Sequence, residues 1–397
     1  MNKPKIVIHC ASGLGNIGDE ALLISFIKRY QKTSDITVLC MNGPAARKYT
    51  GYHKCFSDTD KECKKIINEC DVFILGGGTL FQDETSIYNI YRWGHYLNYA
   101  HKLNKKTMVY ANGIGPLNYA RSRKYVSGIL SKTNVITLRD TESLSELQAM
   151  GIYHATVTAD GVFGLHFHEH PPQSFHYEKP YVCICLRHWF DLIPFLPVSV
   201  CKKLNLQSPK NRLKYAAFID TMVFIINLIN EHYHYNIILL PFMIDRDYKV
   251  ADDIIAKVKF KKHIHIFEEK NFDVQNYFSV IKGAQFVIGM RLHSIIFSII
   301  CATPFIALNY SPKIISLLRY IGLQNLAIDV NHMDYAKVMN LIDYIEGNRA
   351  GISLQEKSAY EKMKKCEDIN EELLLHLLND RCIADYLHQN WEINKEN

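Results

Sequence analysis

The feature that most constrains the fold is an alternation of short apolar runs with longer helical segments, repeated in two series along the 397 residues. The apolar runs of the first series are residues 5–10, 36–41, 71–75, 107–111, 134–138 and 155–158. Those of the second are residues 181–186, 236–241, 263–267, 285–288 and 305–308. Apolar runs of this length, separated by helices of about ten or more residues, are typical of parallel α/β sheets.

The alternation of apolar runs and helical segments is interrupted between the two series. Residues 166–180 are rich in Pro, His and aromatic side chains, and we interpret them as a linker. The sequence therefore predicts an N-terminal Rossmann-like domain (1–165), a C-terminal Rossmann-like domain (181–345) and a helical tail (346–397). Two doubly wound domains that face each other place a ligand in the cleft outside the carboxyl ends of their strands.

Helices are expected between the apolar runs, over residues 19–31, 88–103, 141–150, 215–231, 246–260, 272–282, 293–301 and 312–321. Residues 190–211 show no clear period and suit a long functional loop. The tail contains the strongly apolar segment 371–378, for which we expect packing across the domain junction. A helix on a membrane surface is the alternative, which the acidic residues of the tail disfavour.

Composition excludes several classes of protein. The 46 basic and 40 acidic residues give a net charge of +6, which suits an anionic ligand or a membrane surface and does not indicate nucleic acid. Eleven scattered cysteines without a C-x-x-C pair are typical of reduced thiols in the cytoplasm. No apolar segment reaches the ~20 residues of a membrane helix. The nearest, residues 294–308, is predicted to be a buried helix and strand, which leaves peripheral contact with a membrane open.

A metal site is not expected. The linker contains several histidines, but Glu169 is the one carboxylate near them at ligand spacing. These histidines are His166, His168, His170 and His176.

The loop after the first apolar run matches G-x-G-x-x-G through Gly13, Gly15 and Gly18. This pattern suggests a dinucleotide site, but Asp19 and Glu20 would repel a pyrophosphate at the helix start. We therefore favour a polar loop whose Asn16 and Asp19 contact sugar hydroxyls, with a purely structural loop as the alternative.

Other predicted strands end in loops with polar or glycine residues. Gly76, Gly77 and Gly78 allow close backbone approach, and Gln82 and Asp83 bring an amide and a carboxylate to the same edge. Cations and carboxylates at further strand ends are Arg139, Asp140, Asp160 and Arg187. The alternatives are a tight turn for the glycines, and surface or capping roles for the charged residues.

The most distinctive loop runs from Gly289 to Ser294. Its Arg291 and His293 are two residues apart and open a helix, where they would meet an anion. Lys313 follows the next strand and adds a cation near the same edge. A satisfied histidine at the helix start, with the two cations in solvent, is the structural alternative.

These loops together resemble the polysaccharide pyruvyl transferase family. The matching segments occur in the family's order between about residues 5 and 325. They are residues 15–20, 76–78 with Gln82 and Asp83, 113–116, Arg139 and Asp140 with Ser143, Ala159 and Asp160, and 289–294.

The resemblance implies a two-domain fold similar to GT-B glycosyltransferases. It also implies phosphoenolpyruvate as donor, with no metal or other cofactor, and two hydroxyls of a sugar as acceptor. The product would be a pyruvate ketal on a polysaccharide precursor, often linked to a polyprenyl diphosphate, made in the cytoplasm or at the inner face of its membrane. Arg139, Arg291, His293 and Lys313 match the basic residues that hold the donor in this family.

The chemistry suits these residues. Phosphoenolpyruvate carries a carboxylate and a phosphate, for which Arg139, Arg291 and Lys313 are the expected cations. Because ketal formation protonates the methylene carbon, we expect His293 to act as general acid. The base is one of Asp19, Asp83 and Asp160, which the sequence does not rank. The rival functions are a nucleotide-sugar glycosyltransferase, a non-catalytic glycan- or anion-binding protein, and a dinucleotide oxidoreductase.

Overall fold

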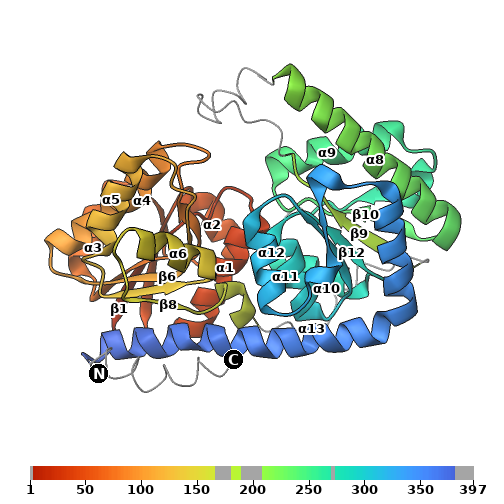
Figure 1. Ribbon diagram of the computed structural model, residues 1–397. Coiled ribbons are helices and arrows are strands. Elements are labelled where there is room, and N and C mark those ends of the chain that lie inside the picture. The colour runs from red at the N-terminus through yellow and green to blue at the C-terminus, as the bar shows by residue number, and fades with distance from the viewer. Residues whose placement is uncertain (1–2, 166–179, 189–207, 270–272, 381–397) are drawn as a thin grey trace.

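A computed structural model describes residues 3–165, 180–188, 208–269 and 273–380. It contains two parallel sheets side by side, each packed between helices, and one long helix that runs beneath both (Figure 1). The architecture is the predicted pair of doubly wound α/β domains. Most of the predicted linker, and most of the loop predicted at 190–211, lie outside the described residues.

The N-terminal sheet is built from strands β1 (Lys5–Cys10), β2 (Asp35–Cys40), β3 (Cys55–Ser57), β4 (Val72–Leu75), β5 (Gly78–Phe81), β6 (Lys106–Ile114), β7 (Val135–Leu138) and β8 (Ala155–Val157). Its helices are α1 (Ile17–Tyr30), α2 (Gly43–Thr50), α3 (Cys63–Glu69), α4 (Tyr88–Lys102), α5 (Ala120–Leu130) and α6 (Thr141–Ala149), followed by the 3-10 turn η1 (Gly161–Gly164).

The C-terminal sheet is built from β9 (Tyr181–Cys185), β10 (Asn236–Leu239), β11 (Ile264–Ile266), β12 (Val287–Gly289), β13 (Phe305–Asn309) and β14 (Ala327–Asp329). Its helices are α8 (Pro209–Tyr233), α9 (Ile244–Lys257), α10 (Val274–Gly283), α11 (Leu292–Cys301) and α12 (Pro312–Tyr320). The long helix α13 (Tyr335–Leu378) ends the described chain.

Both sheets have the strand order of a doubly wound fold. The N-terminal order is β3-β2-β1-β4-β6-β7-β8, with β5 beside β6, and the C-terminal order is β11-β10-β9-β12-β13-β14. The order therefore reverses between β1 and β4 in one domain and between β9 and β12 in the other. Loops separate at such a switch point and leave a crevice at the carboxyl ends of the strands, where ligands bind.

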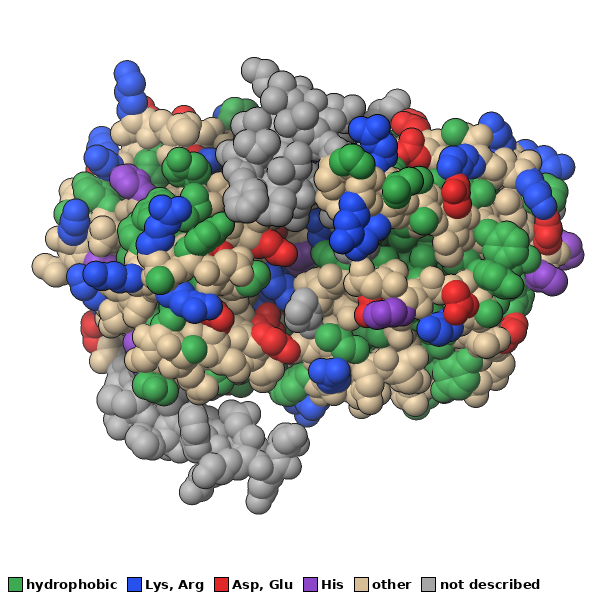
Figure 2. Space-filling model, turned by 45° about the horizontal axis from the view of Figure 1, so that its top comes forward, with side chains coloured by type: hydrophobic (Ala, Val, Ile, Leu, Met, Phe, Trp, Pro, Cys, Tyr) green, Lys and Arg blue, Asp and Glu red, His purple; other side chains and the backbone are tan. Residues whose placement is uncertain are grey.

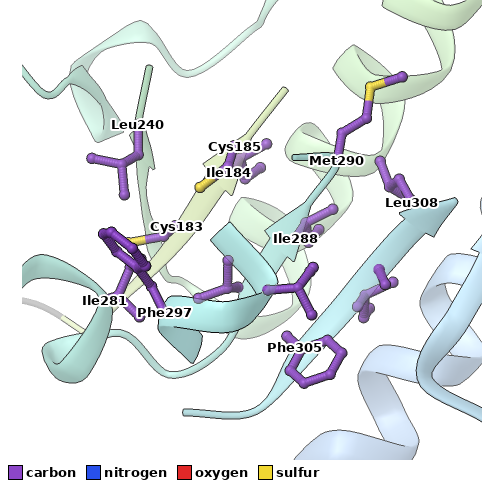
Figure 3. Packing of buried hydrophobic residues seen from close by; sticks show 14 of the residues in the cluster. Cys183, Ile184, Cys185, Leu240, Ile281, Ile288, Met290, Phe297, Phe305 and Leu308 are labelled. Carbon is purple, nitrogen blue, oxygen red and sulfur yellow. The ribbon is translucent and has the colours of Figure 1, made fainter. Parts of the chain in front are cut away.

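The core of the C-terminal domain explains why the sequences of its strands are continuously apolar. Cys183, Ile184 and Cys185 of β9 are buried, as are Ile288 of β12 and Phe297 of α11 (Figure 3). A sheet covered on both faces buries every residue of its central strands, so the alternation of polar and apolar residues disappears.

Helix α13 joins the two domains. It bends at Asn348, and its first part packs Val338, Ile342 and Ile345 on the C-terminal domain. Leu373, Leu374 and Leu377 of its last turns complete the core under the N-terminal sheet. Segment 371–378 therefore packs in the core of the N-terminal domain, and it is α13 as a whole that crosses the domain junction.

The two domains also meet through backbone and apolar contacts. The amide of Ile17 donates to the carbonyl of Phe242 over 2.9 Å, and the amide of Ile244 donates to that of Gly15 over 3.2 Å. Ala21 and Leu22 of α1 and Phe163 of η1 belong to the same buried cluster as the core of the C-terminal domain. The loop after β1 is therefore clamped between the domains.

Helix α8 is longer than the predicted helix over residues 215–231. Among the described helices, it alone is long and apolar enough to cross a membrane by length and composition. Half of its most apolar 18-residue window is buried in the protein. The segment 294–308, which the sequence marked as the nearest such candidate, forms α11 and β13 as predicted.

Candidate active site

The predicted charged residues come from the carboxyl ends of strands in both sheets. Arg139 follows β7 and Asp160 follows β8, whereas Arg291 and His293 follow β12 and Lys313 follows β13. Figure 2 shows acidic, basic and histidine side chains gathered in the hollow between the two domains. The domain packing thus brings together residues more than 130 positions apart in the sequence.

The hydroxyl of Thr79 links cations from the two domains. It accepts a hydrogen bond of 2.7 Å from Nη2 of Arg139 and one of 3.1 Å from Nζ of Lys313. Thr79 lies in β5, directly after the three glycines, and Gly113 leaves the space for this contact. A Cβ on Gly113 would lie 2.9 Å from the Thr79 hydroxyl and 3.1 Å from Nε of Arg139. Two positive charges therefore converge on one small hydroxyl.

The electrostatics of this pair favour an anion. Burial lowers the pKa of Lys313 to about 8, and repulsion from Arg139 contributes to the shift. Arg187, after β9, is a third cation close enough to lower this pKa further. Its guanidinium stacks over the ring of Tyr310 at 4.4 Å and bonds to the Tyr310 hydroxyl. An anion that binds here relieves repulsion among three cations.

His293 is held between a carboxylate and a glycine. Its Nε2 lies 3.6 Å from Oδ2 of Asp160 and has no hydrogen-bond partner in the described part of the chain. A Cβ on Gly18 would lie 1.9 Å from Nδ1 of His293. The third glycine of the G-x-G-x-x-G pattern therefore makes room for a histidine of the other domain, and not for a pyrophosphate.

Two carboxylates flank His293 with opposite pKa shifts. Burial alone raises the pKa of Asp160, but His293 and Arg139 outweigh it and hold that pKa well below its usual range. Nη1 of Arg139 donates to Asp160 over 2.8 Å. Burial raises the pKa of Asp19 above its usual range, and His293, Asn16 and Arg139 offset only part of this shift. Asp160 therefore stays ionised, whereas Asp19 takes up a proton more readily.

The loop after β1 explains the sequence around Asp19. Asn16 caps α1 by accepting from the amide of Gly18 over 3.2 Å, and its amide donates to Asp19 over 2.7 Å. Glu20 turns back and accepts from the amide of Gly13 over 2.7 Å. Glu20 thus fixes the loop while Asp19 faces His293, so the two acidic residues have different tasks.

Arg291 is engaged by a residue that the sequence did not single out. Its Nε and Nη2 each donate to Asp247 over 2.6 Å, which forms a bidentate ion pair. Asp247 also accepts from the amides of Phe242 and Met243, next to the contact with the N-terminal domain. Most of the charge on Arg291 is therefore balanced within the protein, and its guanidinium helps to fix the domain junction.

A family model for polysaccharide pyruvyl transferases matches residues 16–312, which include all of the charged residues described above except Lys313. The chain belongs to the polysaccharide pyruvyl transferase family. The family resemblance seen in the sequence is confirmed, and the protein is a transferase of polysaccharide biosynthesis.

Individual proteins similar to this pyruvyl transferase share little sequence identity with it. The amylovoran biosynthesis protein AmsJ of Erwinia amylovora is 22% identical over 312 residues, or 75% of this chain and 70% of AmsJ. In structure, the chain is similar to MnaA of S. aureus, with a TM-score of 0.62, 10% identity and coverage of 95% and 97% of the two chains. The UDP-GlcNAc 2-epimerase of Neisseria meningitidis has a TM-score of 0.58, 10% identity and coverage of 94% and 99%. These likenesses confirm the GT-B-like fold.

Two residues predicted in the site of this pyruvyl transferase have other partners. Both oxygens of Asp83 are occupied, because they accept from the amides of Asn118 and Tyr119 over 2.7 and 3.1 Å. The Gln82 side chain bonds to Thr85 within its own loop. Asp83 therefore shapes a loop of the N-terminal domain, and its hydrogen bonds do not support a role as catalytic base.

The glycines after β4 lie beside the site. A Cβ on Gly78 would lie 3.6 Å from Oδ1 of Asp19, and Gly78 has a φ of +103° that favours glycine. A Cβ on Gly77 would lie 3.0 Å from the Leu22 side chain. These glycines let β5 begin close to α1, which places Thr79 near Arg139.

No cluster of three or more potential metal ligands occurs among residues 3–165, 180–188, 208–269 and 273–380. The linker histidines at 166, 168, 170 and 176 lie outside these ranges. The expectation that the pyruvyl transferase needs no metal stays a prediction.

Proposed function

We propose that the protein transfers the pyruvyl group of phosphoenolpyruvate to two hydroxyls of a sugar in a polysaccharide precursor, and releases phosphate. The convergence of Arg139 and Lys313 on Thr79, beside His293, supports this proposal most directly. Phosphoenolpyruvate carries its carboxylate and its phosphate on the same carbon, C2, so it needs several cations within one small volume. Arg187 is the third cation of this set.

His293 is the proposed general acid. Asp160 lies 3.6 Å from its Nε2 and stays ionised, so a carboxylate holds the imidazole ring in place on this side. His293 donates its proton to the methylene carbon of the donor, and C2 becomes electrophilic. The first sugar hydroxyl attacks C2, the bond from C2 to the phosphate oxygen breaks, and the second hydroxyl closes the ketal ring.

Asp19 is the proposed base. Asp160 is paired with Arg139, and Asp83 accepts from the backbone just before α5. Asp19, in contrast, faces His293 with a raised pKa. A carboxylate whose pKa lies nearer to neutrality accepts a hydroxyl proton more effectively. Of the two hydroxyl protons, one restores the proton that His293 gave up, and the other leaves with phosphate.

The test compares donor binding with turnover. We expect phosphoenolpyruvate to raise the thermal midpoint of the protein, and UDP to leave it unchanged. His293→Ala should keep this shift and lower phosphate release with a sugar panel by about 100-fold or more. His95→Ala, an exposed histidine on α4, is the matched control and should behave like the parent.

Two results would contradict the proposal. A shift with UDP and none with phosphoenolpyruvate would favour a nucleotide-sugar enzyme. Near-normal phosphate release by His293→Ala, with donor binding intact, would remove the acid role of His293.

A further inference from the structure

The start of α8 stands out from the rest of the molecule. From residue 209 to 217, every side chain is exposed except Asn211 and Tyr215, which are half-buried, and the first buried residue is Phe218. Leu213 is 73% exposed. A 25-residue helix thus begins with more than two turns that contribute no buried side chain to the core.

The charges of this segment have one sign. Lys210, Arg212 and Lys214 are exposed, and none of them forms an ion pair with the described residues. The sequence contains no carboxylate between Asp191 and Asp220. The charged side chains at the exposed start of α8 are therefore all cationic. Lys210 and Lys214 are about one turn apart on the side of Leu213, whereas Arg212 lies on the other side of the helix. Tyr215 of the same segment donates to the carboxylate of Asp253 in α9 over 2.6 Å.

This arrangement works against helix stability. The N-terminus of a helix carries a partial positive charge, which favours acidic and disfavours basic side chains in the first turn. Helix α1 follows this rule with Asp19 and Glu20, whereas α8 has no acidic residue in its first turn. Within α8, which the structure describes in full, the first carboxylate is Asp220. An external anionic surface would therefore offset the unfavourable positive charges of the first turns.

The segment also lies on the side of the molecule that holds the site. A helix that follows a parallel strand begins at the carboxyl edge of the sheet, and α8 follows β9 and Arg187. In Figure 1, α8 begins at the top of the molecule, near the junction of the two domains.

We propose that residues 209–217 of α8 form a docking surface for an anionic lipid bilayer. Lys210, Arg212 and Lys214, which form no ion pair with the described residues, attract acidic headgroups, and Leu213 inserts among the acyl chains. Docking by this surface would hold the domain cleft close to the membrane. That a lipid-linked sugar then enters the cleft rests on the proposed function, whereas the docking surface itself does not.

The test measures sedimentation of the full chain with vesicles. We expect binding to vesicles that contain phosphatidylglycerol, weaker binding at higher salt, and no binding to pure phosphatidylcholine. The K210E/R212E/K214E variant should bind roughly 100-fold more weakly, and L213S about ten-fold more weakly. Because glutamates suit the first turn of a helix, the triple variant should fold like the parent.

The matched control is K61E/K64E/K65E, which changes the net charge equally at exposed lysines of the N-terminal domain. It should bind vesicles nearly as the parent does. The proposed docking surface would be contradicted by an equal loss of vesicle binding in both triple variants, by equal binding to the two lipids, or by no binding of the parent protein. The thermal shift with phosphoenolpyruvate is measured on the same variants without vesicles, so a failure of the proposed function appears separately.

Discussion

At the scale of single residues, the position of His293 depends on what Gly18 lacks. The imidazole occupies the space that a Cβ at residue 18 would need, because that atom would lie 1.9 Å from Nδ1. The ring is therefore aligned between the two domains by a backbone surface on one side and by Asp160 on the other.

Gly18→Ala should consequently displace His293 while α1 remains intact. A displacement of about 1 Å from a productive geometry costs roughly 100-fold in rate, so we expect kcat to fall by about that factor. Gly128→Ala is the control, because no atom lies within 4 Å of its added Cβ. Equal kcat values for both variants, measured by phosphate release, would contradict the proposed placement of His293.

The pKa of Lys313 predicts how donor use depends on pH. Lys313 is charged below its pKa of about 8 and loses its charge as the pH rises through that value. If Lys313 binds the donor, kcat/KM for phosphoenolpyruvate should fall about ten-fold per pH unit above pH 8.

Lys313→Arg supplies a cation that stays charged, so the alkaline fall should disappear while kcat/KM at pH 7 changes only a few-fold. A pH profile with the same alkaline fall in both proteins would assign that fall to another group.

Much of this site could be predicted from the sequence, because the site residues come directly after predicted strands. Arg139, Asp160, Arg291 and His293 lie at the predicted edge, and they meet there because the two sheets face each other. Thr79 and Asp247 were missed, since one hydroxyl or one carboxylate near a strand end looks ordinary. Their roles arise from partners more than 40 residues away, which a periodic pattern does not contain.

At the scale of elements, the long and strongly apolar segments were predictable. The strands β1, β4, β9 and β13 lie close to their predicted positions. The short elements α2, α3, β3, β5 and β14 were missed, as was α5. A strand of three residues has too few positions to show a period, and its pairing with a neighbouring strand decides its conformation.

Helix α13 carries a buried carboxyl whose partner is missing among the described residues. Both oxygens of Glu356 are buried without a hydrogen bond, and burial raises its pKa to about 9. A carboxyl with a raised pKa in the folded state favours the protonated protein, so stability falls as the pH rises from about 4.5 through about 9.

Glu356→Met should therefore stabilise the protein more at pH 7 than at pH 5, by about 3 kcal/mol from two pH units. Urea unfolding at the two pH values measures this difference. Glu361→Met, at an exposed position of the same helix, should change stability by less than about 0.5 kcal/mol. A gain for Glu356→Met that is equal at both pH values would show that the carboxyl has its ordinary pKa.

At the scale of the whole molecule, the domains share a core, a backbone contact and one helix. Arg29 of α1 bonds to Glu367 and Asp368 of α13, and Thr158 bonds to Asn370 over 3.0 Å. Contacts of this kind between the domains should make their unfolding cooperative.

Leu374→Ala tests this cooperativity, because Leu374 is fully buried on the N-terminal domain. We expect a loss of about 2–5 kcal/mol in the free energy of unfolding. Hydrogen exchange should report this loss in the slowest amides of both sheets. The neighbouring Leu375, 44% exposed, provides the control Leu375→Ala. Loss of protection in the N-terminal sheet alone would show that the domains unfold separately.

The path of α13 has a consequence for how the protein is made. The sheet of the N-terminal domain is complete once residue 157 has been synthesised, but Leu373, Leu374 and Leu377 cover its apolar face more than 200 residues later. Until the ribosome has released these last turns, the first domain to emerge keeps an uncovered apolar surface. The final helix therefore completes the core that α1 already covers in part, and newly made chains should need protection from aggregation during that interval.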